Sequence, residues 1–274
     1  MAGCKYYATS VANLEMGSYL KAVILAGGLG TRMREETELK PKPMVEIGGR
    51  PVLWHLMKIY SQHGIKDFVV LAGYKSEVIK SYFSNLDLHT RDFTVRTGEA
   101  DGIEYLSGQS EDWQISVVDT GDDTLTGERL LRAKDIIGSE PFHCTYGDGL
   151  APVDLARLEK THANSGKLGT MTVTRPSNRF GVVEFDDYGL VLAFREKPKM
   201  ADWVNMGYFV FDSKIFEYLK LDESLEDGAL QRLAGMGQMA VNQYDGFWEP
   251  MDTFREYKLL NYLWDSNNAP WKVW

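Results

Sequence analysis

Two segments near the start of the chain carry residues that could bind phosphate. Leu25-Ala26-Gly27-Gly28-Leu29-Gly30-Thr31-Arg32 places three glycines directly after an apolar run. Glycines let a backbone approach a ligand closely and point several N–H groups at an anion. The segment Lys40-Pro41-Lys42-Pro43-Met44 follows, and its prolines hold the chain extended. Its two lysines and Arg32 could together surround a triphosphate.

The glycine-rich turn does not match two common nucleotide-binding patterns. No Gly-Lys-Ser/Thr follows at the spacing of a P-loop, and Met33 stands where the dinucleotide fingerprint needs a third Gly or an Ala. Taken alone, the turn could be a tight loop without a ligand, and the Lys-Pro-Lys segment could be a solvated basic loop. Their combination favours an anion-binding site.

Two aspartates from distant parts of the chain could hold a divalent cation. Asp148 lies in Tyr146-Gly147-Asp148-Gly149, after a predicted buried strand, and Asp252 lies just before a predicted helix. Mg²⁺ prefers a few carboxylates together with phosphate oxygens of a substrate. Alternatively, Asp148 could be an ordinary turn residue and Asp252 the N-cap of the helix.

A third group of charges lies at the end of a predicted hairpin, in Phe194-Arg195-Glu196-Lys197-Pro198. Lys197 could place a cation beside a second phosphate, and Glu196 could accept hydrogen bonds from sugar hydroxyls. The alternative is a charged strand end that binds nothing.

The elements that must position these residues predict an α/β fold. Short runs rich in Val, Ile and Leu alternate with segments of helical apolar spacing. This pattern indicates a Rossmann-like, mainly parallel sheet with helices on both faces, in which ligands bind at the carboxyl ends of the strands. The predicted strands are 21–26, 67–72, 113–118, 142–146, 169–174 and 205–211. The predicted helices are 51–63, 76–83, 126–137, 153–164, 213–219 and 253–264.

The later part of the chain predicts a smaller antiparallel elaboration. Residues 181–185 and 191–196 flank an Asp187-Tyr188-Gly189 turn, which is typical of a hairpin. No repeat or flexible linker separates this part from the rest, so we expect residues 20–274 to form one domain. Residues 1–19 lack the basic and apolar regions of a signal peptide. We expect them to be a leader or a disordered extension.

Composition restricts the classes of function. The net charge of -9 argues against nucleic acid as a partner, and no apolar run is long enough to cross a membrane. Cys4 and Cys144 are too few for a disulfide framework, so a cytoplasmic location is expected. A homo-oligomer is also expected, although Trp264, Trp271 and Trp274 could pack on a neighbour or on the chain's own core.

Together these residues resemble the sugar-1-phosphate nucleotidyltransferases. The motifs that carry the resemblance are Gly27-Gly28-x-Gly30-Thr31-Arg32, Lys40-Pro41-Lys42-Pro43, Gly147-Asp148 and Glu196-Lys197-Pro198. The resemblance extends from about residue 21 to the C-terminus and implies a GT-A-like nucleotidyltransferase fold. It is greatest to the glucose-1-phosphate cytidylyltransferases, through residues 43–49, 118–123, 145–149, 246–253 and 269–272.

The resemblance implies an enzyme that uses Mg²⁺ to transfer CMP from CTP to a sugar 1-phosphate, such as glucose 1-phosphate. It assigns catalysis to Arg32, Lys42 and Asp148, and the metal to Asp148 and Asp252. The residues that it assigns to the nucleotide are Leu25, Gly27, Gly28, Gly30, Thr31, Arg32, Thr126 and Arg129. Those that it assigns to the sugar phosphate are Gly181, Glu196, Lys197 and Asn205.

Three departures from the family pattern leave the acceptor open. Met206 replaces a glycine after Asn205, which predicts a bulky side chain near the sugar. Glu128 replaces a glycine before Arg129, and residues 225–230 lack a Glu and a Pro of the corresponding family segment. The chain could therefore be a cytidylyltransferase for another phosphorylated small molecule. A non-catalytic regulator that binds sugar nucleotides is a further alternative, against which the paired aspartates argue.

Overall fold

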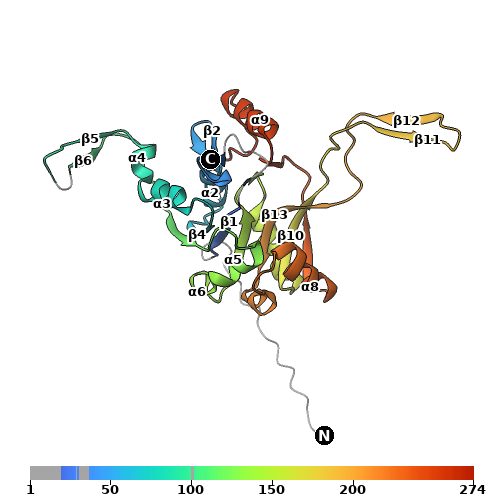
Figure 1. The fold of residues 1–274 in the computed structure, drawn as a ribbon, viewed down its shortest axis with the longest axis horizontal. Helices are drawn as coiled ribbons and strands as arrows, with labels where there is room; N and C mark the ends of the chain where they lie inside the picture. Colours follow the sequence, from blue (N-terminus) through green and yellow to red (C-terminus); the bar gives the residue numbers. More distant parts are fainter. Residues whose placement is uncertain (1–19, 29, 31–36, 100–101) are drawn as a thin grey trace, which may run out of the picture.

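Short apolar runs form the central sheet of the protein, which the computed structural model describes for residues 20–28, 30, 37–99 and 102–274 (Figure 1). Seven strands lie in the order β14-β10-β13-β8-β1-β4-β7. Their bounds are β1 Ala22–Ala26, β4 Asp67–Ala72, β7 Gln114–Asp119, β8 Phe142–Tyr146, β10 Gly169–Thr174, β13 Val204–Phe211 and β14 Met239–Gln243. The expected leader or extension, residues 1–19, lies outside the described residues.

The sheet is mainly parallel, as the sequence predicts. β1 pairs in parallel with β4 and β8, β4 with β7, and β10 with β14. β13 runs antiparallel to both of its neighbours, β10 and β8. Because β1 and β8 are parallel neighbours, the segments that follow them emerge side by side at one edge of the sheet.

Helices cover both faces of the sheet, which explains why β1 is apolar along its whole length and β4 along nearly all of it. Ala22, Ile24 and Ala26 of β1 contact one hydrophobic cluster, whereas Val23 and Leu25 contact the other. The first cluster includes residues of α2 (Val52–Gln62), α3 (Ser76–Ser84), α7 (Leu155–Ser165) and α9 (Phe254–Asp265). The second includes residues of α5 (Thr126–Arg132), α6 (Lys134–Ile137), η3 (Ser213–Tyr218), η4 (Leu225–Ala229) and α8 (Leu230–Gly235).

The structure departs from the predicted elements at several places. The helix predicted at 126–137 is interrupted at Ala133, between α5 and α6. The predicted helix 213–219 is the 3₁₀ helix η3, and residues 225–229 form a π-helix, η4. Strand β14 was not predicted. The remaining short elements are η2 Lys42–Met44, β2 Glu46–Ile47, β3 Arg50–Pro51, α4 Leu86–Thr90, β9 Gly149–Leu150 and β15 Glu249–Pro250.

Two hairpins project from opposite sides of the body (Figure 1). β11 (Val182–Phe185) and β12 (Val191–Arg195) form the predicted hairpin, and β5 (Phe93–Val95) and β6 (Ile103–Tyr105) form a second that was not predicted. Large apolar side chains of the β11–β12 hairpin are 64–68% exposed; they are Phe185, Leu190, Leu192 and Phe194. Within the described ranges, no helix combines the length and apolarity that a membrane crossing would need.

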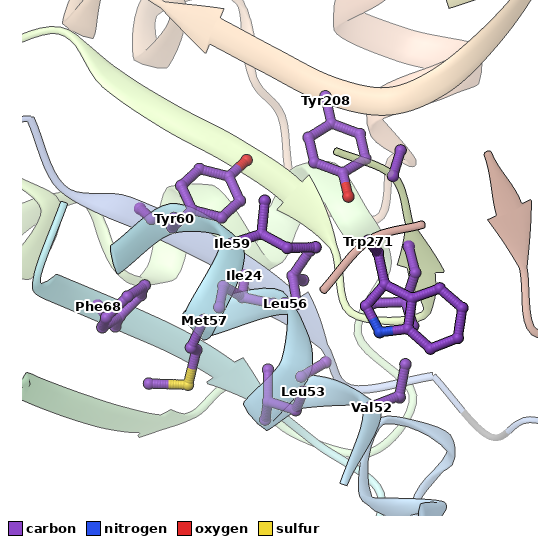
Figure 2. Packing of buried hydrophobic residues seen from close by; sticks show 14 of the residues in the cluster. Ile24, Val52, Leu53, Leu56, Met57, Ile59, Tyr60, Phe68, Tyr208 and Trp271 are labelled. Carbon is purple, nitrogen blue, oxygen red and sulfur yellow. The ribbon is translucent and has the colours of Figure 1, made fainter. Parts of the chain in front are cut away.

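The C-terminal tryptophans pack on the chain's own core. Trp271 is fully buried beside α2 (Figure 2), and its indole N–H donates to Nδ1 of His55 at 3.4 Å. The other ring nitrogen of His55, Nε2, lies 2.8 Å from the carbonyl oxygen of Ile47. A neutral Nε2–H tautomer satisfies both contacts. Gly48 has φ +58° and allows Trp264 to approach closely, since a Cβ there would lie 2.0 Å from the indole nitrogen.

Burial of His55 makes folding sensitive to acid. Burial lowers the pKa of this imidazole to about 4, although its hydrogen bond to Ile47 acts in the opposite direction. Between about pH 6.5 and pH 4 the unfolded chain therefore binds a proton that the folded chain excludes. We expect the contribution of His55 to the free energy of unfolding to be fully present above about pH 6.5. The free energy of unfolding should then fall by about 3 kcal/mol as the pH is lowered toward 4.

Urea unfolding of the wild type and His55→Gln across this pH range tests the expectation, and the variant should show the weaker pH dependence. His89→Gln, which removes an exposed histidine, is the control and should keep the wild-type slope. The same slope in both variants would contradict the role of His55.

Candidate active site

A cavity of about 630 Å³ opens at the carboxyl ends of β1 and β8. The side of the cavity next to β1 is lined by Leu25, Ala26, Gly27, Gly28, Gly30, Lys42, Pro43, Thr124, Leu125, Thr126 and Arg129. The remainder is lined by Tyr146, Gly147, Asp148, Asn205, Ser224, Glu226, Trp248, Pro250 and Asp252. The structure thus brings the described part of the glycine turn, Lys42 and both aspartates into one cavity.

The pairing of β1 with β8 places the glycine turn beside Asp148. Leu25 and Tyr146 are register partners, and the backbone N–H of Gly147 donates to the carbonyl of Leu25 at 3.0 Å. A Cβ on Gly147 would lie 3.0 Å from that same oxygen, so a larger residue would push the two segments apart. Thr31 and Arg32, which complete the predicted turn, lie outside the described residues.

Lys42 bridges the two aspartates. Its Nζ donates to Oδ2 of Asp148 at 2.5 Å and to Oδ1 of Asp252 at 2.7 Å, and its side chain is only 13% exposed. Burial disfavours the ammonium, but the charges of both carboxylates and their hydrogen bonds outweigh it and raise the pKa of Lys42. Lys40 from the same segment instead pairs with Glu46 at 3.1 Å.

Local structure brings the aspartates together. β9, directly after Asp148, pairs with β15, and the N–H of Met251 donates to the carbonyl of Asp148 at 2.9 Å. The N-cap of α9 is Thr253, which forms a capping box with Glu256. Asp252 is therefore not the cap, and its carboxylate is directed to Lys42.

The donor set of this cluster fits a magnesium ion that also binds the substrate. No group of three or more His, Cys, Asp or Glu side chains in the described part of the chain could hold a metal alone. Asp148 and Asp252 supply two carboxylates, and their oxygens already share one cation, the ammonium of Lys42. Mg²⁺ is commonly held by one or two carboxylates together with substrate phosphates and water, so phosphate oxygens would complete the site.

Arg129 binds the backbone of the glycine turn through the carbonyl of Gly27. Its guanidinium donates at 2.6–3.2 Å to the carbonyls of Gly27, Ala72, Gly121 and Asp122 and to Oγ1 of Thr120. The side chain is buried, and burial lowers its pKa. Gly27 permits this contact, because a Cβ there would lie 2.2 Å from Arg129 Nη1. Arg129 therefore connects the glycine turn to the ends of β4 and β7.

The predicted sugar-phosphate residues do not all come together. Asn205 lines the cavity. Gly181, which precedes β11, and Glu196 and Lys197, which follow β12, are not among the residues that line it. Glu196 and Lys197 are exposed, and their charged groups are 3.5 Å apart. Lys197 has φ +45°, a backbone conformation that non-glycine residues rarely adopt.

The expectation that Met206 crowds the sugar is wrong. Successive residues of a strand face opposite sides of the sheet. On β13 it is Asn205 that lines the cavity, whereas the side chain of Met206 is 2% exposed and belongs to the hydrophobic core. Glu128, the second departure from the family pattern, also has a structural role. Its carboxylate accepts hydrogen bonds from Arg132 and from the backbone N–H of Asp222.

Glu226, Trp248 and Tyr146 are among the cavity residues to which the sequence analysis assigned no role. Glu226 comes from the altered segment 225–230, and its carboxylate accepts a hydrogen bond from Oγ1 of Thr126 at 2.6 Å and another from the hydroxyl of Tyr146. The indole N–H of Trp248 is buried without a hydrogen-bond partner among the described residues. The one sequence signal for Trp248 and Tyr146 is that they lie close in the chain to the predicted aspartates Asp252 and Asp148.

The chain is similar to several known nucleotidyltransferases. A family model described as nucleotidyl transferase matches residues 21–253. The chain is 46% identical over 258 residues to the glucose-1-phosphate cytidylyltransferase of Salmonella typhi, covering 93% of this chain and 100% of that relative. It is 30% identical over 225 residues to the UTP–glucose-1-phosphate uridylyltransferase of Synechocystis, covering 76% of this chain and 53% of that relative. The solved structure of a UDP-glucose pyrophosphorylase has the same fold, with a TM-score of 0.65 at 18% identity, covering 90% of this chain and 99% of that one.

Proposed function

The chain belongs to the nucleotidyl transferase family, and from this premise we propose that it transfers CMP from CTP to glucose 1-phosphate. Nucleotidyl transfer to a sugar 1-phosphate is the activity of the family. The observation that carries the proposal is the bridge of Lys42 between Asp148 and Asp252, beside the glycine turn. An ammonium and a pair of carboxylates in one cavity of about 630 Å³ favour catalysis over binding alone.

Glucose 1-phosphate and CTP are proposed from similarity over nearly the whole chain. The cytidylyltransferase of Salmonella typhi is covered along its full length. Met206 and the altered segment 225–230 are the reasons to expect a different acceptor, but the side chain of Met206 lies in the core rather than in the cavity. That departure therefore no longer argues for a different acceptor.

The proposed reaction is an in-line displacement at the α-phosphorus of CTP. A phosphate oxygen of glucose 1-phosphate forms the new P–O bond, the bond to the β-phosphate breaks, and pyrophosphate leaves. The nucleophile needs no general base, because the second pKa of a phosphate monoester is near 6. Positioning and charge neutralisation are then the main tasks of the protein.

Each group in the cavity has a proposed part in these tasks. The glycine turn, including Thr31 and Arg32, surrounds the triphosphate, and Lys42 neutralises charge at the phosphate under attack. Asp148 and Asp252 would hold Mg²⁺, which when bound neutralises further phosphate charge. For Arg129, whose donors are used by the backbone, we propose that it positions the glycine turn. Thr126 remains a proposed nucleotide contact.

We also propose a homo-oligomer in the cytoplasm. The apolar side chains of the β11–β12 hairpin are exposed, and packing against a second copy would remove them from water. This hairpin also carries Gly181, Glu196 and Lys197, whose proposed contact with the sugar phosphate requires the hairpin to be placed by such a neighbour. The buried free thiol of Cys144 supports a reducing compartment.

Pyrophosphate release in the presence of Mg²⁺ tests the proposal, with four nucleoside triphosphates combined with a panel of phosphorylated acceptors. We expect the fastest release with CTP and glucose 1-phosphate. Release with CTP and only another acceptor would keep the mechanism and replace the substrate. No release from folded protein that still binds nucleotide would contradict the enzyme and favour a regulator.

Lys42 occupies the position between the aspartates, so it should compete there with a divalent cation. Charges about 4 Å apart near a protein surface interact by roughly 4 kcal/mol. We therefore expect Lys42→Met to bind Mn²⁺ without nucleotide at least about 10-fold more tightly than the wild type, as measured by electron paramagnetic resonance. Turnover should fall by at least about 10² in Lys42→Met and in Asp148→Ala.

Lys40→Met is the matched control, because Lys40 pairs with Glu46 and does not line the cavity. It should leave Mn²⁺ affinity unchanged. The added affinity of Lys42→Met should disappear when Asp148→Asn is combined with it. Equal Mn²⁺ affinity in the wild type and Lys42→Met would show that the ammonium and the cation do not share a site.

A further inference from the structure

We propose that Glu226 determines acceptor specificity by accepting hydrogen bonds from hydroxyl groups of the sugar. This inference rests on the proposed function and names a residue for the acceptor side of the same cavity. Glu226 belongs to the π-helix η4 and lines the cavity together with Ser224, the residue that caps η4. Single turns of π-helix occur frequently at functional sites.

Glu226 differs from every other charged side chain in the cavity by its partners. Lys42, Asp148 and Asp252 neutralise one another, and Arg129 is bound by backbone carbonyls and a threonine hydroxyl. Glu226 is held only by neutral hydroxyls, those of Thr126 and Tyr146, and no Lys or Arg of the described ranges forms an ion pair with it. Its negative charge is therefore left facing the ligand.

A carboxylate without a cationic partner is unfavourable in a cavity that must bind two anions. It repels phosphate groups, because like charges at close range are unfavourable. It can stay only where the ligand presents hydroxyl donors, and there it orients the ligand by attracting one end and repelling the other. Each carboxylate oxygen accepts one protein hydrogen bond and keeps a further lone pair for a ligand.

One of its two partners, Tyr146, connects Glu226 to the acceptor side. Tyr146, which donates to Glu226, also interacts through its hydroxyl with the side chain of Asn205. Its ring packs against Gly207, where a Cβ would lie 2.2 Å away. Glu226 is thus linked through Tyr146 to β13 and to the segment that carries Asp148.

The decisive experiment pairs a change in the enzyme with the removal of single hydroxyls from the substrate. Glu226→Gln keeps the shape of the side chain and removes its charge. We expect the KM for glucose 1-phosphate to rise about 10-fold, equivalent to about 1.4 kcal/mol, with the KM for CTP changed less than about 2-fold. Among 2-, 3-, 4- and 6-deoxy glucose 1-phosphates, at least one should cost the wild type the same factor and cost Glu226→Gln nothing further.

Asp227→Asn is the matched control, since Asp227 is an exposed carboxylate on the same turn that bonds only to Ser224. It should keep wild-type KM values for both substrates. Glu226→Asp is the substitute test variant if Glu226→Gln does not fold. It keeps the charge but not the reach, so it should lose the same coupling.

Three outcomes would overturn the inference. Coupling to 2′- or 3′-deoxy-CTP instead of a deoxy sugar would show that the carboxylate binds ribose. An equal loss with every acceptor, without coupling to any hydroxyl, would reduce Glu226 to a support for Tyr146. Unchanged KM values would remove it from recognition.

Failure of the proposed function is a separate result. If the wild type released no pyrophosphate with any substrate pair, the same series of deoxy sugars would be compared by calorimetric binding. Equal affinities of the wild type and Glu226→Gln for glucose 1-phosphate would then overturn the inference as well.

Discussion

The structure depends on one constraint, that two carboxylates in a partly buried cavity require a positive charge between them. The side chains of Asp148 and Asp252 are 28% and 32% exposed, and the ammonium of Lys42 supplies the charge. We propose that a divalent ion bound to a triphosphate replaces it. The β9–β15 pair brings the two aspartates together, and the short helix η2 supplies Lys42. The catalytic proposal follows from the competition between two kinds of cation for one position.

The remaining cavity residues support the same arrangement from two directions. Arg129 fixes the glycine turn through backbone carbonyls, so the N–H groups that we propose for phosphate binding are held before a ligand arrives. Tyr146 and Glu226 form a polar pair beside Asn205. The body around the cavity is packed on both faces of the sheet, whereas the β11–β12 hairpin stays exposed. The described residues proposed for the nucleotide therefore lie in the packed body, whereas Gly181, Glu196 and Lys197, proposed for the sugar phosphate, flank the strands of the exposed hairpin.

The sequence predicts those features that depend on local pattern. The apolar runs identified β1, β4 and β8, and the residues after β1 and β8 gave the glycine turn and Asp148. The bridge of Lys42 to both aspartates confirms that these distant segments meet. Other features depend on which side of a strand a residue faces and on tertiary contacts. The side of β13 to which Met206 points, the carbonyls that engage Arg129 and the partners of Glu226 cannot be deduced from spacing. The break at Ala133 and the edge strand β14 likewise depend on packing rather than on periodicity.

A crystal structure with Mg²⁺ and CDP-glucose bound would test the central claim most directly. The account predicts that Mg²⁺ lies between Asp148 and Asp252 and that Nζ of Lys42 has left both carboxylates for a phosphate oxygen. A structure in which Lys42 still bridges the two aspartates while the metal and the phosphates lie elsewhere would contradict it.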